Sequence, residues 1–323
     1  MDELMDTCDV VVIGGGAAGL NGALMLARSR RAVVVIDSGL PRNAPADGVH
    51  GLLGHDGIPP AELVARGRDE VRRYGGHIVS GEVTTAVRDD DGFVVSLADG
   101  RAVRARRLLV TTGLVDELPD VPGVRELWGH DVLHCPYCHG WEVRDKRIGI
   151  LASGPRAMHQ ALLFRQLSDD ITYFSHTAPP TAEEREQLAA RNIRVVDTRV
   201  ASLAVANGHL AGIDLVDGSA VACDALVVMP RMVARAGFLG DIGLTLSEHP
   251  SGLGDHLPVD AMGRTEIDGV WAAGNVTDIA AQVGASAAAA AFAAAQINAD
   301  LVMEDTAKAV AAHRNPGLAF SRQ

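Results

Sequence analysis

Residues 135–139, Cys-Pro-Tyr-Cys-His, have the composition and the spacing for thiol redox chemistry. Two residues separate the cysteines, so both sulfur atoms lie on one turn and can cycle between a dithiol and a disulfide. A helix N-terminus or a neighbouring imidazole can lower the pKa of such a thiol from its usual value of about 8.5. His134 and His139 flank the pair directly. The stretch therefore predicts a catalytic redox pair, Cys135 and Cys138.

Other interpretations of these residues stay open at this stage. Cys-x-x-Cys-His is also the pattern of c-type haem attachment, and the cysteines with His134 and His139 make four possible metal ligands. Haem attachment fits poorly, because residues 1–30 lack the apolar segment of a secretory signal. A structural zinc usually takes two separated pairs, whereas Cys8 and Cys223 are isolated, so we predict no metal site. Unreactive buried cysteines are the third interpretation.

Composition and charge narrow the class of protein. A chain of 323 residues is long enough for about two domains. Its net charge of -12 argues against nucleic acid or an anionic membrane as a partner. The longest apolar stretch, residues 285–295, is rich in alanine and too short to span a bilayer. Four cysteines do not make a secreted disulfide framework, so we expect a cytoplasmic protein.

The elements that must position the redox pair begin with a dinucleotide-binding pattern. Residues 8–13 form a short apolar run typical of a buried parallel strand, and a Gly-x-Gly-x-x-Gly motif follows over residues 14–19. We expect a helix over residues 20–28 and a second strand over residues 32–36, which ends at Asp37. Strand, glycine motif, helix, strand and acid in this order predict a bound dinucleotide.

Each glycine of the motif has a physical role in such a site. Gly14 permits a tight turn, Gly16 lets the backbone approach a pyrophosphate, and Gly19 lets helix and strand pack closely. The helix N-terminus supplies amide donors to the phosphates. Asp37 is expected to bind the ribose hydroxyls of the adenosine.

The same plan occurs twice along the chain. Alternating strands over residues 82–110 contain hairpin signals at Asp91-Gly92 and Asp99-Gly100. A linker rich in proline and glycine follows over residues 119–123. The later half then repeats strand, turn, helix and strand, over residues 147–151, 152–157, 157–167 and 171–174, and ends with a meander and a strand over residues 225–229. We therefore predict an α/β protein with two Rossmann-like dinucleotide-binding domains.

The C-terminal part carries a resemblance to a known class of flavoproteins. Residues 265–275 end in Gly274-Asn275, and an alanine-rich helix is expected from about Gln282 to Leu301. These residues look like the second flavin motif of the flavoproteins with two dinucleotide domains, which has Asp where this chain has Asn275. An amide can still hydrogen-bond a ribityl hydroxyl. The resemblance implies FAD as cofactor and a discontinuous FAD domain, residues 1–116 and 246–323, with a second domain, residues 117–245, inserted.

Because the Cys-x-x-Cys pair opens the inserted domain, nearly the whole chain resembles the low-molecular-weight thioredoxin reductases. That resemblance implies that Cys138 faces the flavin and that Cys135 is the interchange thiol facing substrate. His139 stands where the reductases have an acid, and an imidazole suits a proton shuttle. A homodimer is also expected by resemblance.

The resemblance further implies which residues contact FAD. Gln282 and Val283 open the last helix, whose N-terminus is expected to face the flavin pyrimidine ring. His50 and His55 lie in a glycine-rich loop, residues 48–57, for which we expect a plain loop role. The tail, residues 306–323, reads as loosely structured. The full set of expected FAD-binding residues is Gly14, Gly16, Ala18, Gly19, Asp37, Ser38, Arg42, Val83, Thr112, Gly113, Gly274, Asn275, Gln282 and Val283.

The second nucleotide site departs from the reductase pattern. Residues 152–157, Ala-Ser-Gly-Pro-Arg-Ala, have Ala152 in place of the first glycine, and Pro155 removes a backbone amide. Residues 175–180, Ser-His-Thr-Ala-Pro-Pro, replace the arginines that hold the 2′-phosphate of NADPH in the reductases. We therefore expect poor NADPH binding.

Without a nicotinamide donor, electrons must enter the cysteine pair from a dithiol. Residues 135–140 are also similar to the dithiol oxidases that close the disulfides of gliotoxin-, holomycin- and romidepsin-type natural products. This resemblance predicts an FAD-dependent dithiol oxidase of antibiotic biosynthesis, with a small-molecule dithiol and O2 as substrates and hydrogen peroxide as product. The alternatives are an NAD(P)H-dependent, thioredoxin reductase-like disulfide reductase and a flavin-binding redox sensor that does not turn over.

Overall fold

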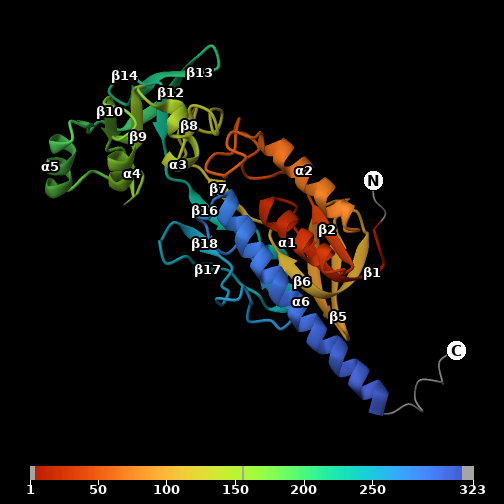
Figure 1. Ribbon diagram of the computed structural model, residues 1–323. Helices are drawn as coiled ribbons and strands as arrows, with labels where there is room; N and C mark the ends of the chain where they lie inside the picture. Colours follow the sequence, from red (N-terminus) through yellow and green to blue (C-terminus); the bar gives the residue numbers. More distant parts are fainter. Residues whose placement is uncertain (1–3, 155, 315–323) are drawn as a thin grey trace. The chain divides into compact units, whose positions relative to one another are not determined.

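The computed structural model describes residues 4–154 and 156–314, and its backbone divides into two compact units (Figure 1). The first unit combines the chain up to Pro41, Ala61–Leu114 and the chain from Ala234 onward. The second unit combines Arg42–Pro60 and Val115–Val233. Strands β7 (Leu114–Glu117) and β16 (Arg231–Ala234) lie where the chain passes between the units.

These units differ in two places from the expected domains 1–116, 246–323 and 117–245. The second crossing falls at residue 233, so η2 (Gly237–Ile242) belongs to the first unit. Residues 42–60 also pack with the second unit, although the sequence places them inside the first dinucleotide fold. This segment therefore lies in the same unit as the redox pair.

The first unit is built on a mixed sheet in the order β3-β2-β1-β6-β5-β4, with β19 parallel to β6. Strands β1 to β3 and β6 run parallel, and Val10 to Val12 pair with Val33 to Val35. Their side chains are fully buried, because both faces of a parallel sheet are covered. The elements of this sheet and the helices of the unit are β1 (Thr7–Ile13), α1 (Ala17–Arg28), β2 (Val33–Asp37), α2 (Pro60–Arg73), β3 (His77–Ser80), β4 (Val83–Asp89), β5 (Gly92–Leu97), β6 (Ala102–Val110), β19 (Val270–Ala272) and α6 (Val283–Arg314), and β17 (Ser247–Glu248) pairs with β18 (Gly254–His256).

Helix α6 packs along α1 on one face of this sheet (Figure 1). Small and aliphatic side chains form its buried stripe, namely Ala290, Ala293, Ala294, Ile297 and Leu301. A Cβ on Gly22 of α1 would lie 3.3 Å from the Ala290 carbonyl oxygen, so the two helices approach closely. By length and composition alone α6 could cross a membrane, and within this unit its buried stripe packs against α1.

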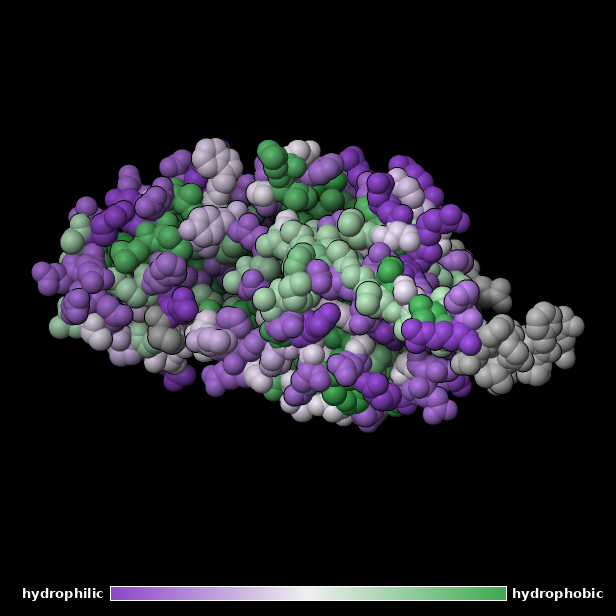
Figure 2. Space-filling view, turned by 60° about the horizontal axis from the view of Figure 1, so that its bottom comes forward, coloured by the Kyte–Doolittle hydropathy of each residue, from purple (hydrophilic) through white to green (hydrophobic). Residues whose placement is uncertain are grey.

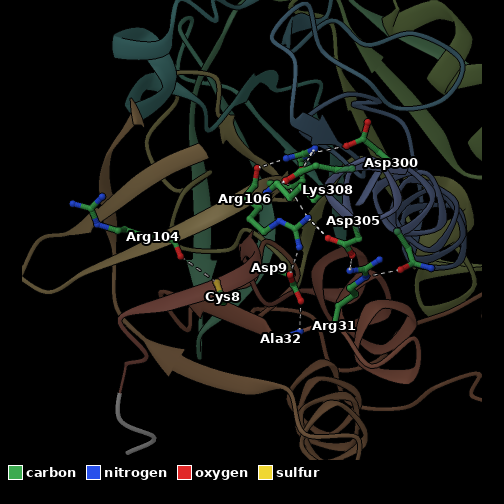
Figure 3. Close-up of polar contacts among 12 residues, drawn as sticks. Cys8, Asp9, Arg31, Ala32, Arg104, Arg106, Asp300, Asp305 and Lys308 are labelled. Carbon is green, nitrogen blue, oxygen red and sulfur yellow. Dashed lines mark hydrogen bonds and ion pairs between the residues drawn. The ribbon is translucent and has the colours of Figure 1, made fainter. Parts of the chain in front are cut away.

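The expectation of a loosely structured tail is wrong for residues 306–314. Helix α6 continues to Arg314, because its second half is held to the sheet by ion pairs (Figure 3). Arg106 of β6 binds Asp305, and Arg107 binds Glu304 at 2.7 Å and Asp300 at 2.6 Å. Residues 315–323 lie outside the described residues.

The face of the molecule seen in Figure 2 carries many hydrophilic side chains between its apolar patches.

The second unit repeats the parallel design on a smaller scale. Its five-stranded sheet has the order β11-β10-β9-β15-β8, and a three-stranded antiparallel sheet, β12-β13-β14, follows β11 in the chain. The turn at Asn207-Gly208 has positive φ at both residues, as expected for a tight hairpin. The elements are β8 (Val132–Leu133), α3 (Pro136–His139), η1 (Trp141–Val143), β9 (Ile148–Leu151), α4 (Ala157–Phe164), β10 (Ile171–Phe174), α5 (Ala182–Ala190), β11 (Arg194–Val196), β12 (Val200–Ala206), β13 (His209–Leu215), β14 (Ala220–Ala222) and β15 (Ala225–Val227). The two Rossmann-like domains expected from the sequence are thus confirmed.

Candidate active site

The first glycine motif forms a close-packed turn between β1 and α1. Gly14 has φ +102°, which favours glycine, and a Cβ on Gly19 would lie 1.8 Å from the Gly14 carbonyl oxygen. At Gly16, by contrast, a Cβ would meet no atom within 4 Å. Gly16 is also the N-cap of α1, where no side chain caps the helix. The turn therefore leaves open space beside a helix N-terminus, which fits the pyrophosphate of a dinucleotide.

Two side chains fix this turn from neighbouring strands. The Asp37 carboxylate, at the end of β2, accepts hydrogen bonds from the Gly15 amide at 3.0 Å and from Arg68 at 2.5 Å. A carboxylate has lone pairs to spare for a ribose hydroxyl. The buried Thr111 hydroxyl contacts the carbonyl oxygens of Ile13 and Gly14 at 3.0 and 2.9 Å. Thr111 was not among the expected site residues, and its place directly after β6 is the only signal for it in the sequence.

The C-terminal flavin-like motif meets the same turn. Gly274 has φ +83°, and a Cβ there would lie 2.9 Å from the Cβ of Ala18 in α1. The Asn275 amide donates to the carbonyl oxygens of Asp278 and Ala281 at 2.9 and 2.8 Å, which shapes the loop before α6. Gln282 precedes the first helical residue, Val283, and accepts a hydrogen bond from Ser286. The N-terminal glycine turn and the segment that precedes α6 thus lie against each other in the first unit.

The remaining expected FAD residues are more dispersed. Thr112 and Gly113 follow β6 and hydrogen-bond to the Arg235 backbone at 2.5 and 3.0 Å. Ser38 is exposed after β2, and Val83 begins β4. Arg42 lies in the second unit, where its guanidinium forms a two-pronged ion pair with Asp116 at 2.7 and 2.6 Å.

The redox pair lies at the start of α3 in the second unit. Cys135 and Cys138 form a disulfide, and their Cα atoms are 5.3 Å apart. Cys135 is the N-cap of α3, and its sulfur accepts a hydrogen bond from the Cys138 amide at 3.2 Å. Pro136 occupies the first helical position, where its fixed φ suits the turn. An N–H directed at the Cys135 sulfur would stabilise a thiolate there after reduction.

His134 does not supply the positive charge that its position beside Cys135 suggests. Its ring stacks on Trp128, with the ring centroids 5.6 Å apart. Burial lowers the pKa of His134 to about 4, helped by the charge of Arg42 and opposed by that of Asp116. The ring is therefore neutral at physiological pH, and it acts as a packing group beside the disulfide.

His139 ends α3 and is also neutral near pH 7, for a different balance of reasons. Burial lowers its pKa below 6.5, whereas Glu142 and Asp47 raise it and His50 and His130 lower it. A neutral imidazole can accept a proton, which a protonated one cannot. His139 can thus act as a base toward a thiol that enters the site.

Several residues around the pair were not among the expected site residues. Gln160 of α4 is buried, and its amide donates to the carbonyl oxygens of His134 and Val228 at 3.1 and 3.3 Å. It thereby ties the chain that enters the redox motif to the end of β15. Glu142 and Asp47, whose carboxylates raise the pKa of His139, come from η1 and from the segment 42–60. Their roles depend on packing between distant parts of the sequence.

The free cysteines belong to the hydrophobic cores. Burial raises the pKa of Cys8 to about 12, and the same effect raises that of Cys223 to about 12. A thiol of this kind is unreactive at neutral pH. The interpretation as buried, unreactive cysteines therefore holds for these two residues and not for the disulfide pair.

In the second dinucleotide fold, the Asp197 carboxylate lies beside the residue that follows β10. The Ser175 hydroxyl, after β10, donates to the Asp197 carboxylate at 2.9 Å, and Asp197 follows the neighbouring strand β11. Arg185 of α5 pairs with the same carboxylate at 2.5 Å. Ala152 is fully buried at the end of β9, while Pro155 lies outside the described residues. A carboxylate thus lies beside residues 175–180, which replace the arginines that hold the 2′-phosphate in the reductases.

Comparisons with known proteins agree with this geometry. The model of the family Pyridine nucleotide-disulphide oxidoreductase matches residues 8–296. A thioredoxin reductase, tcpT, from Claviceps purpurea is 35% identical over 280 residues, which cover 83% of this chain and 86% of the relative. A second, sirT from Leptosphaeria maculans, is 30% identical over 84% of this chain and 88% of the relative.

Solved structures give the same result. The crystal structure of HlmI has a TM-score of 0.89 and 46% identity, and the match covers 96% of this chain and 97% of HlmI. TrxB from Bacillus anthracis has a TM-score of 0.86 and 27% identity over 92% of this chain and 99% of TrxB.

The similarity thus runs through both dinucleotide folds and includes the segment that carries the disulfide. Thioredoxin reductase-like proteins are flavoproteins, and the open space at Gly16 suits their cofactor, FAD. Because the family model extends from β1 into α6, the chain belongs to the pyridine nucleotide-disulphide oxidoreductase family, as a thioredoxin reductase-like oxidoreductase that binds FAD.

Proposed function

We propose that this protein is an FAD-dependent dithiol oxidase that closes an intramolecular disulfide in a small-molecule dithiol. The observation that carries the proposal is the Asp197 carboxylate, bound by Ser175 at 2.9 Å in the second nucleotide-binding half. A carboxylate beside the site of a 2′-phosphate repels that group, since like charges at short range disfavour binding. This favours a thiol substrate over NADPH as the electron donor. The resemblance of residues 135–140 to the dithiol oxidases also supports electron flow from a thiol substrate to the cysteine pair.

The cysteine pair accepts the electrons in two exchange steps. A substrate thiolate attacks the Cys135 sulfur, the Cys135–Cys138 bond breaks, and Cys138 leaves as a thiolate. The second substrate thiolate then attacks the substrate sulfur of this mixed disulfide. The substrate disulfide forms, and Cys135 leaves as a thiolate next to the Cys138 amide. The substrate loses two electrons and two protons, and the cysteine pair gains the two electrons.

His139 handles the protons of these steps. Because its pKa lies below 6.5, it is neutral when a substrate thiol arrives and can take the thiol proton.

The glycine turn at residues 14–19, Asp37 and the start of α6 would hold FAD. Bound FAD would accept the two electrons of the cysteine pair and pass them to O2, which gives hydrogen peroxide. The net reaction converts a dithiol and O2 into a disulfide and hydrogen peroxide.

An anaerobic titration of the FAD-loaded protein tests this proposal. We expect a dithiol to bleach the flavin absorbance under nitrogen and one equivalent of peroxide to form per dithiol when air is admitted. NADPH should leave the absorbance unchanged. Cys135→Ser and Cys138→Ser should each abolish bleaching by the dithiol. Rapid bleaching by NADPH with none by dithiols would overturn the proposal.

A disulfide reductase that uses NAD(P)H is the second candidate, because the relatives from Claviceps purpurea and Leptosphaeria maculans are named thioredoxin reductases. Reduction of a thioredoxin by NADPH in the presence of this protein would favour this second candidate.

We also propose a homodimer, which light scattering of the FAD-loaded protein tests directly.

A further inference from the structure

The segment 42–60 forms a closed loop within the second unit. The Val49 amide donates to the Ile58 carbonyl oxygen at 2.8 Å, and the Gly57 amide donates to that of Val49 at 2.8 Å. The Gly51 amide donates to the Asp56 carboxylate at 2.9 Å. These bonds close the loop on both sides of its one partly buried imidazole, His50, and hold that residue in a defined place.

His50 lies between two carboxylates. Its Nδ1 is 3.5 Å from the Asp56 carboxylate and its Nε2 is 3.4 Å from the Glu142 carboxylate. The side chains of His50 and Glu142 are 27% and 34% exposed, whereas that of Asp56 is 69% exposed. The imidazole therefore joins a carboxylate beside the redox helix to one at the surface.

Glu142 follows His139 by three residues, and its carboxylate raises the pKa of that imidazole. The charged and titratable groups that act on His139 come from three parts of the unit: Glu142 from η1, Asp47 and His50 from the segment 42–60, and His130 from the turn before β8. The two carboxylates favour a protonated His139, and the two imidazoles oppose it. Among these groups, His50 and Glu142 are also paired with each other.

We propose that His50 is a positioning residue for the redox site, which holds the Glu142 carboxylate toward His139 so that this imidazole can take up the substrate proton. His50 acts through Glu142 and touches neither the cysteines nor the substrate in this role. The role rests on the proposed function, in which His139 is the base. It departs from the plain loop role expected for residues 48–57.

The direction in which His50→Ala shifts the pKa of His139 distinguishes this positioning role from a purely electrostatic one. If His50 holds Glu142, then His50→Ala releases that carboxylate, and the pKa of His139 falls. If His50 acted only through its own positive charge, the same substitution would raise the pKa of His139. We expect the pKa of His139 to fall for His50→Ala and for Glu142→Gln, and by less than for a fully buried pair, since the groups are partly exposed.

The measurement is a histidine NMR titration of the FAD-loaded protein, with the His139 signal assigned from His139→Gln. The double variant His50→Ala/Glu142→Gln should shift that signal no further than Glu142→Gln alone, because paired residues are not additive. His50→Gln, whose amide can still donate to Glu142, should retain most of the wild-type pKa. His55→Ala, in the same loop and exposed, should leave it unchanged.

A rise in the pKa of His139 on His50→Ala, or no change, would overturn the inference. The acid limb of flavin bleaching by a dithiol should move in the same direction as the NMR signal. If dithiols bleach no flavin while the NMR shifts occur as expected, the proposed function fails and the positioning role of His50 stands. If bleaching occurs and the NMR signal does not move, the positioning role fails and the proposed function stands.

Discussion

The Ser175 hydroxyl donates a hydrogen bond of 2.9 Å to the carboxylate of Asp197, across the ends of the neighbouring strands β10 and β11. Arg185 is drawn to the same carboxylate, with Nη2 2.5 Å from Oδ1. Hydrogen bonds from Arg185 and then from Ser175 lower the pKa of Asp197, so this carboxylate is ionised at neutral pH. At this edge of the second dinucleotide fold the Asp197 carboxylate is thus ionised, and Arg185 is already paired with it.

Removing that charge should restore part of a nucleotide site. The variant Ala152→Gly/His176→Arg/Asp197→Asn restores the glycine at the turn, adds a cation and releases Arg185 from its acidic partner. We expect it to bind NADPH at least about tenfold more tightly than the wild type, because Arg–phosphate pairs are strong. NADPH fluorescence measures the affinity. Ala152→Gly/His176→Arg, which retains Asp197, is the matched control and should bind more weakly than the triple variant. Equal affinity of the wild type and the triple variant would contradict this account.

Two glycines of the first motif should respond differently to alanine. At Gly16 a Cβ meets no protein atom within 4 Å, so Gly16→Ala should fold normally yet bind FAD at least about tenfold more weakly, because the methyl group would take space needed by the pyrophosphate. At Gly19 a Cβ would lie 1.8 Å from the Gly14 carbonyl oxygen, so Gly19→Ala should lower the free energy of unfolding by about 3 kcal/mol. Flavin absorbance and urea unfolding separate the two effects. Gly240→Ala, also without a neighbour within 4 Å, is the control and should change neither quantity. Normal FAD binding by Gly16→Ala would place the cofactor elsewhere.

His134 should make the fold sensitive to mild acid. Its pKa is about 4 in the folded protein and 6.5 when unperturbed, so the unfolded chain binds the proton more readily. Stability is therefore fully present above pH 6.5 and falls as the pH drops toward 4, by about 2 kcal/mol at pH 5. His134→Phe, which can still stack on Trp128, should lack this loss. Urea unfolding at pH 7 and pH 5 measures the difference, and His159→Phe, exposed on α4, is the control. An equal loss in the wild type and in His134→Phe would show that burial of this ring does not govern the effect.

Local rules predicted the first glycine turn well, because φ at Gly14 and the packing of Gly19 depend on residues that are near in sequence. They also placed the disulfide at Cys135 and Cys138. The charge state of His134 could not be read in this way. Its position beside a cysteine suggests a cation, whereas the stacking on Trp128 and the burial that keep it neutral are tertiary effects.

The partners of His50 and the end of α6 also could not be predicted from the sequence. His50 meets Glu142 across 92 positions of the chain, because the segment 42–60 packs with the second unit. The alanine-rich pattern ends near Leu301, but the helix continues to Arg314. Beyond Leu301 the helix has no buried apolar stripe, and arginines of β6, almost 200 residues away in the sequence, bind it at Glu304 and Asp305.

Glu304 should make this attachment of α6 dependent on pH. Burial raises the pKa of Glu304, but hydrogen bonds from Lys308 and Arg107 and the charges of Arg106 and Arg107 outweigh it and lower the pKa to about 2. A carboxylate with a lowered pKa stabilises the fold fully above its unperturbed value of 4.5, and this contribution is lost as the pH falls from 4.5 toward 2. Because Glu304 is partly exposed, solvent screening reduces the contribution to about 1 kcal/mol.

Glu304→Gln removes the charge at every pH. We therefore expect the variant to be less stable than the wild type at pH 6 and the difference to shrink by pH 3, because the unfolded wild-type chain takes up a proton at this residue below pH 4.5 while the folded one does not. Urea unfolding of the FAD-loaded protein, followed by circular dichroism at both pH values, measures this. Glu70→Gln, exposed on α2, should match the wild type at pH 6. A difference between Glu304→Gln and the wild type that stays constant from pH 6 to pH 3 would mean that the charge of Glu304 does not stabilise the fold, and that α6 is held by its packing on α1 and by the ion pairs of Asp300 and Asp305.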